Sequence, residues 1–199
     1  MSAKTLLQMA GAAPVPATLA SAALVVVDAQ QEYTTGRLPL AGVDAALEEI
    51  ARLLARARKA GTPVIHVKHR GRAGGLFDPA TNSFVISPRA APAAGETVIE
   101  KGLPNAFAGT TLKEALDATG RKEIILAGFA THMCVEATAR AAIDLGLKPT
   151  VVAAATATRD LPDALGGGTL GAAEVKRNAL AALADRFATV VADQAGIAD

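Results

Sequence analysis

One stretch decides the fold: residues 124–135 read IILAGFATHMCV and contain the chain's only cysteine, Cys134. The first four residues are apolar and include two β-branched isoleucines, as in a buried strand of a parallel sheet, and Gly128 then ends the run. Thr131 is a residue type that often caps a helix N-terminus, so we expect Cys134 in the first helical turn. The stretch predicts a strand that leads directly into a helix.

Two interpretations of Cys134 follow from this position. The free N–H groups and the partial positive charge at a helix N-terminus favour a thiolate and can hold an oxyanion, so the residue is a candidate nucleophile. Free cysteines are also commonly buried as small hydrophobic residues. The position alone favours neither interpretation.

The same alternation of strand and helix recurs along the rest of the chain. The expected strands span residues 22–28, 63–69, 97–101, 124–127, 150–154 and 188–192, and the expected helices span 43–60, 109–119, 131–145 and 172–187. We predict an α/β fold with a three-layer, doubly wound, mostly parallel sheet of about six strands and helices on both faces. Residues 1–21 are expected to form an N-terminal arm, and residues 22–199 a single domain.

Composition limits the classes of partner. The chain has 20 basic and 19 acidic residues, so it lacks the positive charge expected of a protein that binds nucleic acid or anionic membranes. Its apolar runs are too short to span a membrane, and its N-terminus does not have the pattern of a signal peptide. A single cysteine excludes an intrachain disulfide and fits a reducing compartment. We expect a cytoplasmic protein that binds a small molecule, and neither nucleic acid nor a membrane.

Three reactive side chains lie next to predicted strand ends. Asp28 and Lys101 each end a strand, and Cys134 follows the strand that ends before Gly128. Carboxyl ends of parallel strands meet at one edge of a sheet, so we expect the three side chains to converge. Singly, they are explained as a surface carboxylate, an ion-paired lysine and a buried thiol. Together they provide a base, a cation and a nucleophile, which indicates a catalytic cysteine.

The motifs that contain these residues resemble the isochorismatase-like cysteine hydrolases, over roughly residues 22–191. Those motifs are VVVDAQQEY at 25–33, IEKGLPNAFAGT at 99–110 and GFATHMCV at 128–135. The resemblance implies that Asp28 is the general base, that Lys101 helps hold the thiolate, and that Cys134 attacks an electrophilic carbon.

The resemblance also implies the kind of reaction. A non-proline cis peptide bond is implied between Phe129 and Ala130, with the backbone N–H groups of Ala130 and Cys134 as the oxyanion hole. The cysteine favours hydrolysis of a C–N bond in a small amide, carbamoyl or ureido substrate through a covalent intermediate, without a cofactor. The alternatives are an isochorismatase-like or nicotinamidase-like hydrolase and a non-catalytic ligand-binding homologue. A redox-sensing cysteine would need a resolving partner, which the chain lacks. Members of the family are commonly homo-oligomers, which implies a dimer or tetramer.

Residues that flank the strand ends are candidates for the pocket wall. They are Gln30, Tyr33, His69, Phe77, Phe84, Asn105, Phe107 and His132. Nicotinamidase-type members carry an Asp-x-His metal motif after the second strand, and this chain has none. His66 and His69 should lie on opposite faces of their strand, which is a poor arrangement for one ion, so we expect no metal site. Substrate specificity is expected in the loop of residues 70–92.

Overall fold

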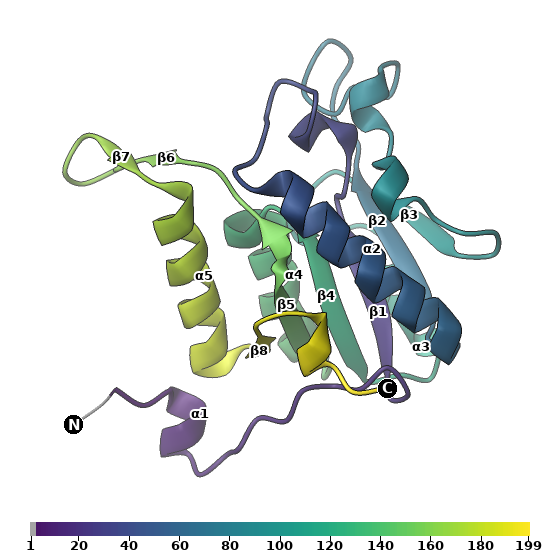
Figure 1. Ribbon diagram of the computed structural model, residues 1–199, viewed down its shortest axis with the longest axis vertical. Helices are drawn as coiled ribbons and strands as arrows, with labels where there is room; N and C mark the ends of the chain where they lie inside the picture. The colour runs from purple at the N-terminus through teal and green to yellow at the C-terminus, as the bar shows by residue number, and fades with distance from the viewer. Residues whose placement is uncertain (1–2) are drawn as a thin grey trace.

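A six-stranded parallel sheet organises the chain in the computed structural model, which describes residues 3–199 (Figure 1). The strand order is β3-β2-β1-β4-β5-β8, and every neighbouring pair is parallel. The strands are β1 (Ala22–Val27), β2 (Val64–His69), β3 (Thr97–Lys101), β4 (Glu123–Phe129), β5 (Lys148–Ala157) and β8 (Thr189–Val191). The helices are α1 (Leu6–Met9), α2 (Val43–Ala60), α3 (Leu112–Ala118), α4 (Glu136–Asp144) and α5 (Ala172–Arg186). The predicted fold class is confirmed.

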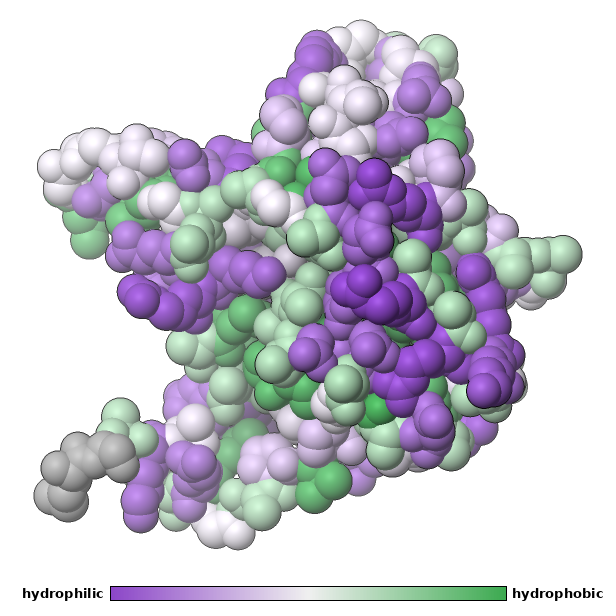
Figure 2. Space-filling model, viewed as in Figure 1, coloured by the Kyte–Doolittle hydropathy of each residue, from purple (hydrophilic) through white to green (hydrophobic). Residues whose placement is uncertain are grey.

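The two faces of the sheet belong to different buried clusters. Along β1, Leu24 and Val26 belong to the cluster that contains the apolar side of α2, whereas Val25 and Val27 belong to the cluster formed with α3, α4 and α5. Both faces are therefore covered, which is why the strand is apolar throughout rather than alternating. Figure 1 shows α2 in front of the sheet with α3 and α4 behind it, and Figure 2 shows a hydrophilic outer surface over α2.

The junction between β4 and α4 differs from the sequence prediction. Residues Thr131–Val135 form a π-helical turn, η4, before the α-helix begins at Glu136. Thr131 was expected to cap the helix, but the N-terminal cap is Ala130 and the Thr131 hydroxyl instead donates to the carbonyl of Ala157, at 3.1 Å. That expectation was wrong because the end of β5 offers the hydroxyl a buried acceptor.

A short hairpin follows β5. The strands β6 (Leu161–Pro162) and β7 (Thr169–Leu170) pair antiparallel in a separate two-stranded sheet. The three glycines at 166–168 that connect them indicate only a loop in the sequence. Strands of two residues leave too short an apolar pattern to predict.

Gly128 brings the ends of β4 and β1 into close contact. The residue pairs with Val27 and has a φ of 119°, a backbone conformation that residues other than glycine rarely adopt. A Cβ atom here would lie 1.9 Å from the carbonyl oxygen of Val27. Glycine is therefore required at the point where β1 ends and Asp28 begins.

The N-terminal arm contacts the domain weakly at first and firmly near its end. The Leu6 N–H donates to the Asp185 carboxylate at 2.8 Å, which holds α1 next to the end of α5. None of residues 3–16 is buried. Ala17 and Leu19, in contrast, belong to the buried core on the α2 side of the sheet.

Candidate active site

Asp28, Lys101 and Cys134 meet at the C-terminal edge of the sheet. Asp28 follows β1, Lys101 is the last residue of β3, and Cys134 lies in η4 after β4. Lys101 Nζ lies 2.6 Å from Asp28 Oδ2 and donates to Cys134 Sγ at 3.3 Å. The side chains of the ion pair are fully buried, and Cys134 is 3% exposed. The ammonium therefore joins a carboxylate to a thiol in an environment that excludes water.

The backbone at Asp28 adopts an uncommon conformation. Its φ is 51°, in the left-handed region that costs a non-glycine residue roughly 1–2 kcal/mol. The Asp28 N–H donates to the carbonyl of Val67 at 2.8 Å, and its own carbonyl accepts from the Gln30 N–H at 2.7 Å. Among residues 3–199, no group hydrogen-bonds to Asp28 Oδ1. That oxygen can accept a proton.

Burial dominates the acid–base properties of these groups. It raises the pKa of the Asp28 carboxyl, and the charge of Lys101 opposes the shift. Burial, together with the charge of Asp28, raises the pKa of the Cys134 thiol to about 12, again opposed by Lys101. Cys134 is therefore a thiol at neutral pH in the resting site. A thiol needs a base when it attacks, and the adjacent carboxylate is placed to serve as one.

His69 lies on the remaining side of the Lys101 ammonium. Its Nδ1 is 3.3 Å from Lys101 Nζ, and its ring packs against Phe77 with centroids 5.1 Å apart at an angle of 61°. Burial and the charge of Lys101 lower the pKa of His69 to about 4. The imidazole is then neutral at neutral pH, and Nδ1 accepts a hydrogen bond from the ammonium while the ring hydrogen is on Nε2.

Gln30 is buried, and its side chain bonds to backbone groups. Its Nε2 donates to the carbonyls of His69 and Phe84 at 2.9 and 3.0 Å, and its Oε1 accepts from the His69 N–H at 2.7 Å. Both amide protons are used, so the substrate contact expected of Gln30 finds no free donor. The side chain joins the end of β1 to the end of β2 and to the 70–92 loop.

Three aromatic rings pack beside the reactive groups. The ring of Tyr33 makes edge-on contacts with Phe77 at 5.1 Å and with Phe129 at 5.8 Å between centroids. Burial raises the pKa of Tyr33, and the charges of Asp28 and Cys134 raise it further. The phenol is therefore neutral across the working range of an enzyme, and the cluster forms a rigid apolar wall.

The remaining pocket candidates bond elsewhere. The Nδ1 atom of His132 hydrogen-bonds to the hydroxyl of Thr158, just beyond β5. Phe107 is partly buried against the cluster on the α3 and α4 side, and the Lys68 ammonium lies 3.8 Å from the ring centroid of Phe84. The side chain of Asn105 accepts from the Phe107 N–H at 2.9 Å. A role of these residues in substrate binding stays a prediction.

Glu32 is a structural member of the site that sequence reasoning missed. Its buried carboxylate accepts the N–H groups of Arg37 at 2.6 Å and Phe77 at 3.1 Å. Burial alone would raise the pKa of Glu32, but these hydrogen bonds lower it. Glu32 therefore fixes the loop that carries Phe77, and its place in the VVVDAQQEY motif is the signal that could have found it.

The peptide bond between Phe129 and Ala130 is cis. The Ala130 carbonyl accepts the N–H groups of Met133 and Val135 at 3.0 and 3.2 Å, which begins the η4 turn. Within residues 3–199, the Ala130 N–H has no acceptor. The oxyanion role expected of the Ala130 and Cys134 N–H groups stays a prediction.

The two strand histidines have different partners. His66 Nε2 lies 2.9 Å from the Glu96 carboxylate, whereas His69 Nδ1 lies 3.3 Å from Lys101 Nζ, so the two imidazoles have different partners. Among the described residues, no three His, Cys, Asp or Glu side chains are grouped to hold a metal ion.

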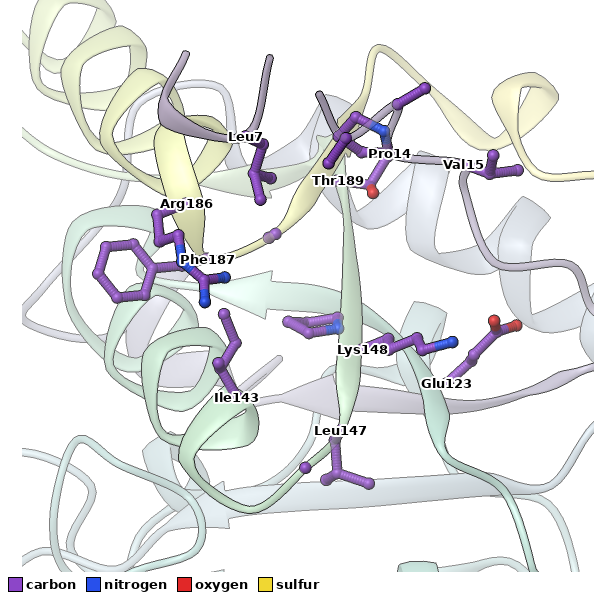
Figure 3. Close-up of a pocket in the computed structure, with 15 residues that line it drawn as sticks. Leu7, Pro14, Val15, Glu123, Ile143, Leu147, Lys148, Arg186, Phe187 and Thr189 are labelled. Atoms are coloured by element: carbon purple, nitrogen blue, oxygen red, sulfur yellow. The ribbon is translucent and has the colours of Figure 1, made fainter. Parts of the chain in front are cut away.

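A large cavity lies at the opposite edge of the sheet from Cys134. It has a volume of about 610 Å³ and separates the N-terminal arm from the N-terminal ends of β4, β5 and β8 (Figure 3). Its labelled walls in Figure 3 are Leu7, Pro14, Val15, Glu123, Ile143, Leu147, Lys148, Arg186, Phe187 and Thr189. Volume alone would place a site there. Cys134 is nevertheless the stronger candidate for the reacting site, because a nucleophile, a base and a cation lie in contact there.

Comparisons with known proteins find relatives over most of the chain. An isochorismatase domain model matches residues 22–195. The chain is 36% identical over 187 residues to the "Secreted isochorismatase effector Isc1" of Verticillium dahliae, covering 94% of this chain and 95% of that protein. It is 37% identical over 147 residues to a maleamate amidohydrolase of Pseudomonas putida, covering 65% and 69% of the two chains. The crystal structure of an isochorismatase from Pseudomonas putida superimposes with a TM-score of 0.94 at 43% identity, covering 98% of this chain and 100% of that one.

The location and the oligomeric state stay predictions. No helix within residues 3–199 has the length and apolar character needed to cross a membrane. One relative is named as a secreted protein, so relatives alone do not assign this chain to the cytoplasm.

Proposed function

The chain belongs to the isochorismatase family of hydrolases, and we propose that it cleaves a C–N bond in a small amide, carbamoyl or ureido compound with Cys134 as the nucleophile. The observation that carries this proposal is the Lys101 ammonium, which lies 2.6 Å from Asp28 and 3.3 Å from Cys134. A cation between a base and a thiol is one arrangement that activates a cysteine nucleophile. The relative named as a maleamate amidohydrolase supports an amide substrate.

In the first half of the proposed reaction, Cys134 attacks the substrate carbonyl. The thiol proton passes to Asp28 while Sγ bonds to the carbonyl carbon, and Lys101 stabilises the developing thiolate. The carbonyl oxygen gains a negative charge, which the backbone N–H groups of Ala130 and Cys134 hold. Asp28 then returns the proton to the nitrogen, the C–N bond breaks, and the amine or ammonia leaves. Cys134 then carries a thioester or, from a carbamoyl or ureido group, the corresponding thiocarbamate.

In the second half, water releases the thioester. Asp28 takes a proton from a water molecule, whose oxygen bonds to the thioester carbon. The C–S bond breaks, Cys134 regains the proton from Asp28, and the product leaves as a carboxylic or carbamic acid. The enzyme returns to its starting state, and each step uses side chains or backbone groups of this chain.

A panel of small amides, carbamoyl and ureido compounds, scored by release of ammonia or amine, tests the proposal. Asp28→Asn, Lys101→Ala and Cys134→Ala should each lower turnover at least about 10³-fold, and the combined variant should lose little more, because the three act as a unit. Two surface ion pairs offer matched controls. Asp44→Asn, which removes the pair with Arg89, and Lys113→Ala, which removes the pair with Asp117, should each keep turnover within about twofold.

The alternatives give different results in the same assay. Turnover that a chelator removes would indicate a nicotinamidase-like enzyme, and cleavage of a vinyl ether without amide hydrolysis would indicate isochorismatase chemistry. A substrate-sized mass on Cys134, found by intact mass spectrometry in the steady state, is expected from a thioester. Saturable binding with no turnover and no adduct would instead indicate a non-catalytic homologue.

A further inference from the structure

Three acceptors surround the Lys101 ammonium, and the role of the third is unassigned. Asp28 Oδ2 lies at 2.6 Å, Cys134 Sγ at 3.3 Å and His69 Nδ1 at 3.3 Å. An ammonium has three N–H donors, so each of the three acceptors can accept one hydrogen bond. A lysine with only two partners could rotate about its last bond and lose either of them. The imidazole removes that freedom.

We propose that His69 is a positioning residue, which holds one proton of the Lys101 ammonium and thereby directs the other two at Asp28 and Cys134. The inference rests on the proposed function, in which Lys101 stabilises the Cys134 thiolate. It assigns His69 to the reacting groups rather than to the substrate.

The surroundings of His69 fix its ring from two sides. Gln30 binds both the N–H and the carbonyl of the His69 backbone, at 2.7 and 2.9 Å. The edge-on contact with Phe77, at 5.1 Å between centroids, restricts rotation of the ring. Glu32 in turn holds the Phe77 N–H at 3.1 Å. The Gln30 amide and the Glu32 carboxylate, both buried, thus help to hold the imidazole of His69 next to the Lys101 ammonium.

The charge state of His69 suits this role. A protonated imidazole has no acceptor and would face the ammonium as a second cation, 3.3 Å away. Burial and Lys101 keep the pKa of His69 at about 4, so the neutral ring is the form present in neutral solution. Near neutral pH, the contact with Lys101 is therefore maintained.

Three substitutions separate positioning from other roles. His69→Asn places an amide oxygen where Nδ1 lies, so it can still accept from Lys101. His69→Leu has a similar size without an acceptor, and His69→Gln carries its amide further out, at the level of Nε2. Gln30 holds residue 69 by two hydrogen bonds to its backbone, which we call the Gln30 clamp. Because the clamp does not involve the side chain of residue 69, all three variants can keep it. Thermal unfolding checks that they do.

The rate of alkylation of Cys134 by iodoacetamide is the first readout, because it needs no substrate and the chain has one cysteine. Loss of a hydrogen bond to a charged group should slow labelling of the Leu and Gln variants about tenfold, while the Asn variant stays within about twofold of the parent. Labelling in urea should be equal for all four proteins. Equal native rates for the Asn and Leu variants would overturn the proposal.

A double-mutant cycle with Lys101→Ala is the second readout. If His69 acts through Lys101, His69→Leu should have no further effect on labelling in the Lys101→Ala background. A full additional loss would show that His69 acts independently. Where a substrate is found, the Leu variant should lower kcat at nearly constant KM. A raised KM with normal labelling would instead make His69 a substrate contact. If no amide is turned over, labelling still decides the role of His69 separately from the proposed function.

Discussion

Glu96 shows at the residue scale how one carboxylate joins three segments. It accepts two hydrogen bonds from the Arg58 guanidinium, at 2.8 and 2.9 Å, and one from the Ala93 N–H at 2.8 Å, and it lies 2.9 Å from His66 Nε2. Arg58 lies on α2, His66 on β2, and Ala93 in the loop before β3. The hydrogen bonds from Arg58 are the main reason that the pKa of Glu96 is about 2.

This pKa predicts how stability depends on pH. The folded-state pKa of Glu96 lies below its ordinary value of 4.5, so its contribution is present above that value and is lost as the pH falls toward 2. In urea unfolding at about pH 6, Glu96→Gln should be destabilised by roughly 2 kcal/mol, and the difference should shrink below about pH 3. Glu48→Gln, at an exposed position on α2, is the control. A difference that persists unchanged in acid would contradict the assignment.

The convergence of Asp28, Lys101 and Cys134 could be predicted because the ends of parallel strands lie at one edge of the sheet. Asp28 and Lys101 each end an apolar run, and a parallel sheet brings such ends together. The clamp of Gln30 on His69 could not be predicted, since the two are 39 positions apart and Gln30 has no pattern that distinguishes a backbone contact from a substrate contact.

At the scale of elements, the close approach of β4 and β1 makes a sharp prediction. Gly128→Ala adds a Cβ that would lie 1.9 Å from the Val27 carbonyl oxygen, at a φ of 119°. Because the obstacle is backbone in the centre of the sheet, we expect a loss of more than about 4 kcal/mol in urea unfolding.

Gly120→Ala isolates the conformational part of that cost. Gly120 has a φ of 70° with open space where the Cβ would go. Its alanine variant should lose only about 1–2 kcal/mol. Similar losses of unfolding free energy for Gly128→Ala and Gly120→Ala would contradict the prediction. They would mean that β4 and β1 can move apart at Gly128 at no cost.

The element boundaries show where local sequence rules lose to tertiary contacts. Helix α2 could be predicted to the residue, because its apolar spacing is regular and Gly61 ends it. The η4 turn could not be predicted, since the hydroxyl of Thr131 does not cap the helix but donates to the Ala157 carbonyl of the neighbouring strand. The sequence around Thr131 cannot reveal this hydrogen bond, because the acceptor lies 26 positions away.

At the scale of the whole molecule, the two edges of the sheet differ in how well they are packed. The C-terminal edge holds the buried reactive groups and the Gln30 clamp. At the N-terminal edge, an open cavity of about 610 Å³ lies between the arm and the domain, and Leu6, Met9 and Val15 stay 46–80% exposed. The hollow between arm and domain is visible at the lower left of Figure 2. The arm should therefore contribute little to stability or to reactivity at Cys134.

Removing the residues before Pro14 tests this separation. The deleted part includes α1, which buries no side chain, so the unfolding free energy should change by less than about 1 kcal/mol, and the alkylation rate of Cys134 should stay within about twofold. Leu19→Ala is the contrasting variant, because Leu19 is fully buried where the arm joins the core. It should cost about 2–4 kcal/mol while leaving the native alkylation rate unchanged. If the deletion slowed alkylation of Cys134, the arm would affect the C-terminal edge of the sheet, and the two edges would not be independent.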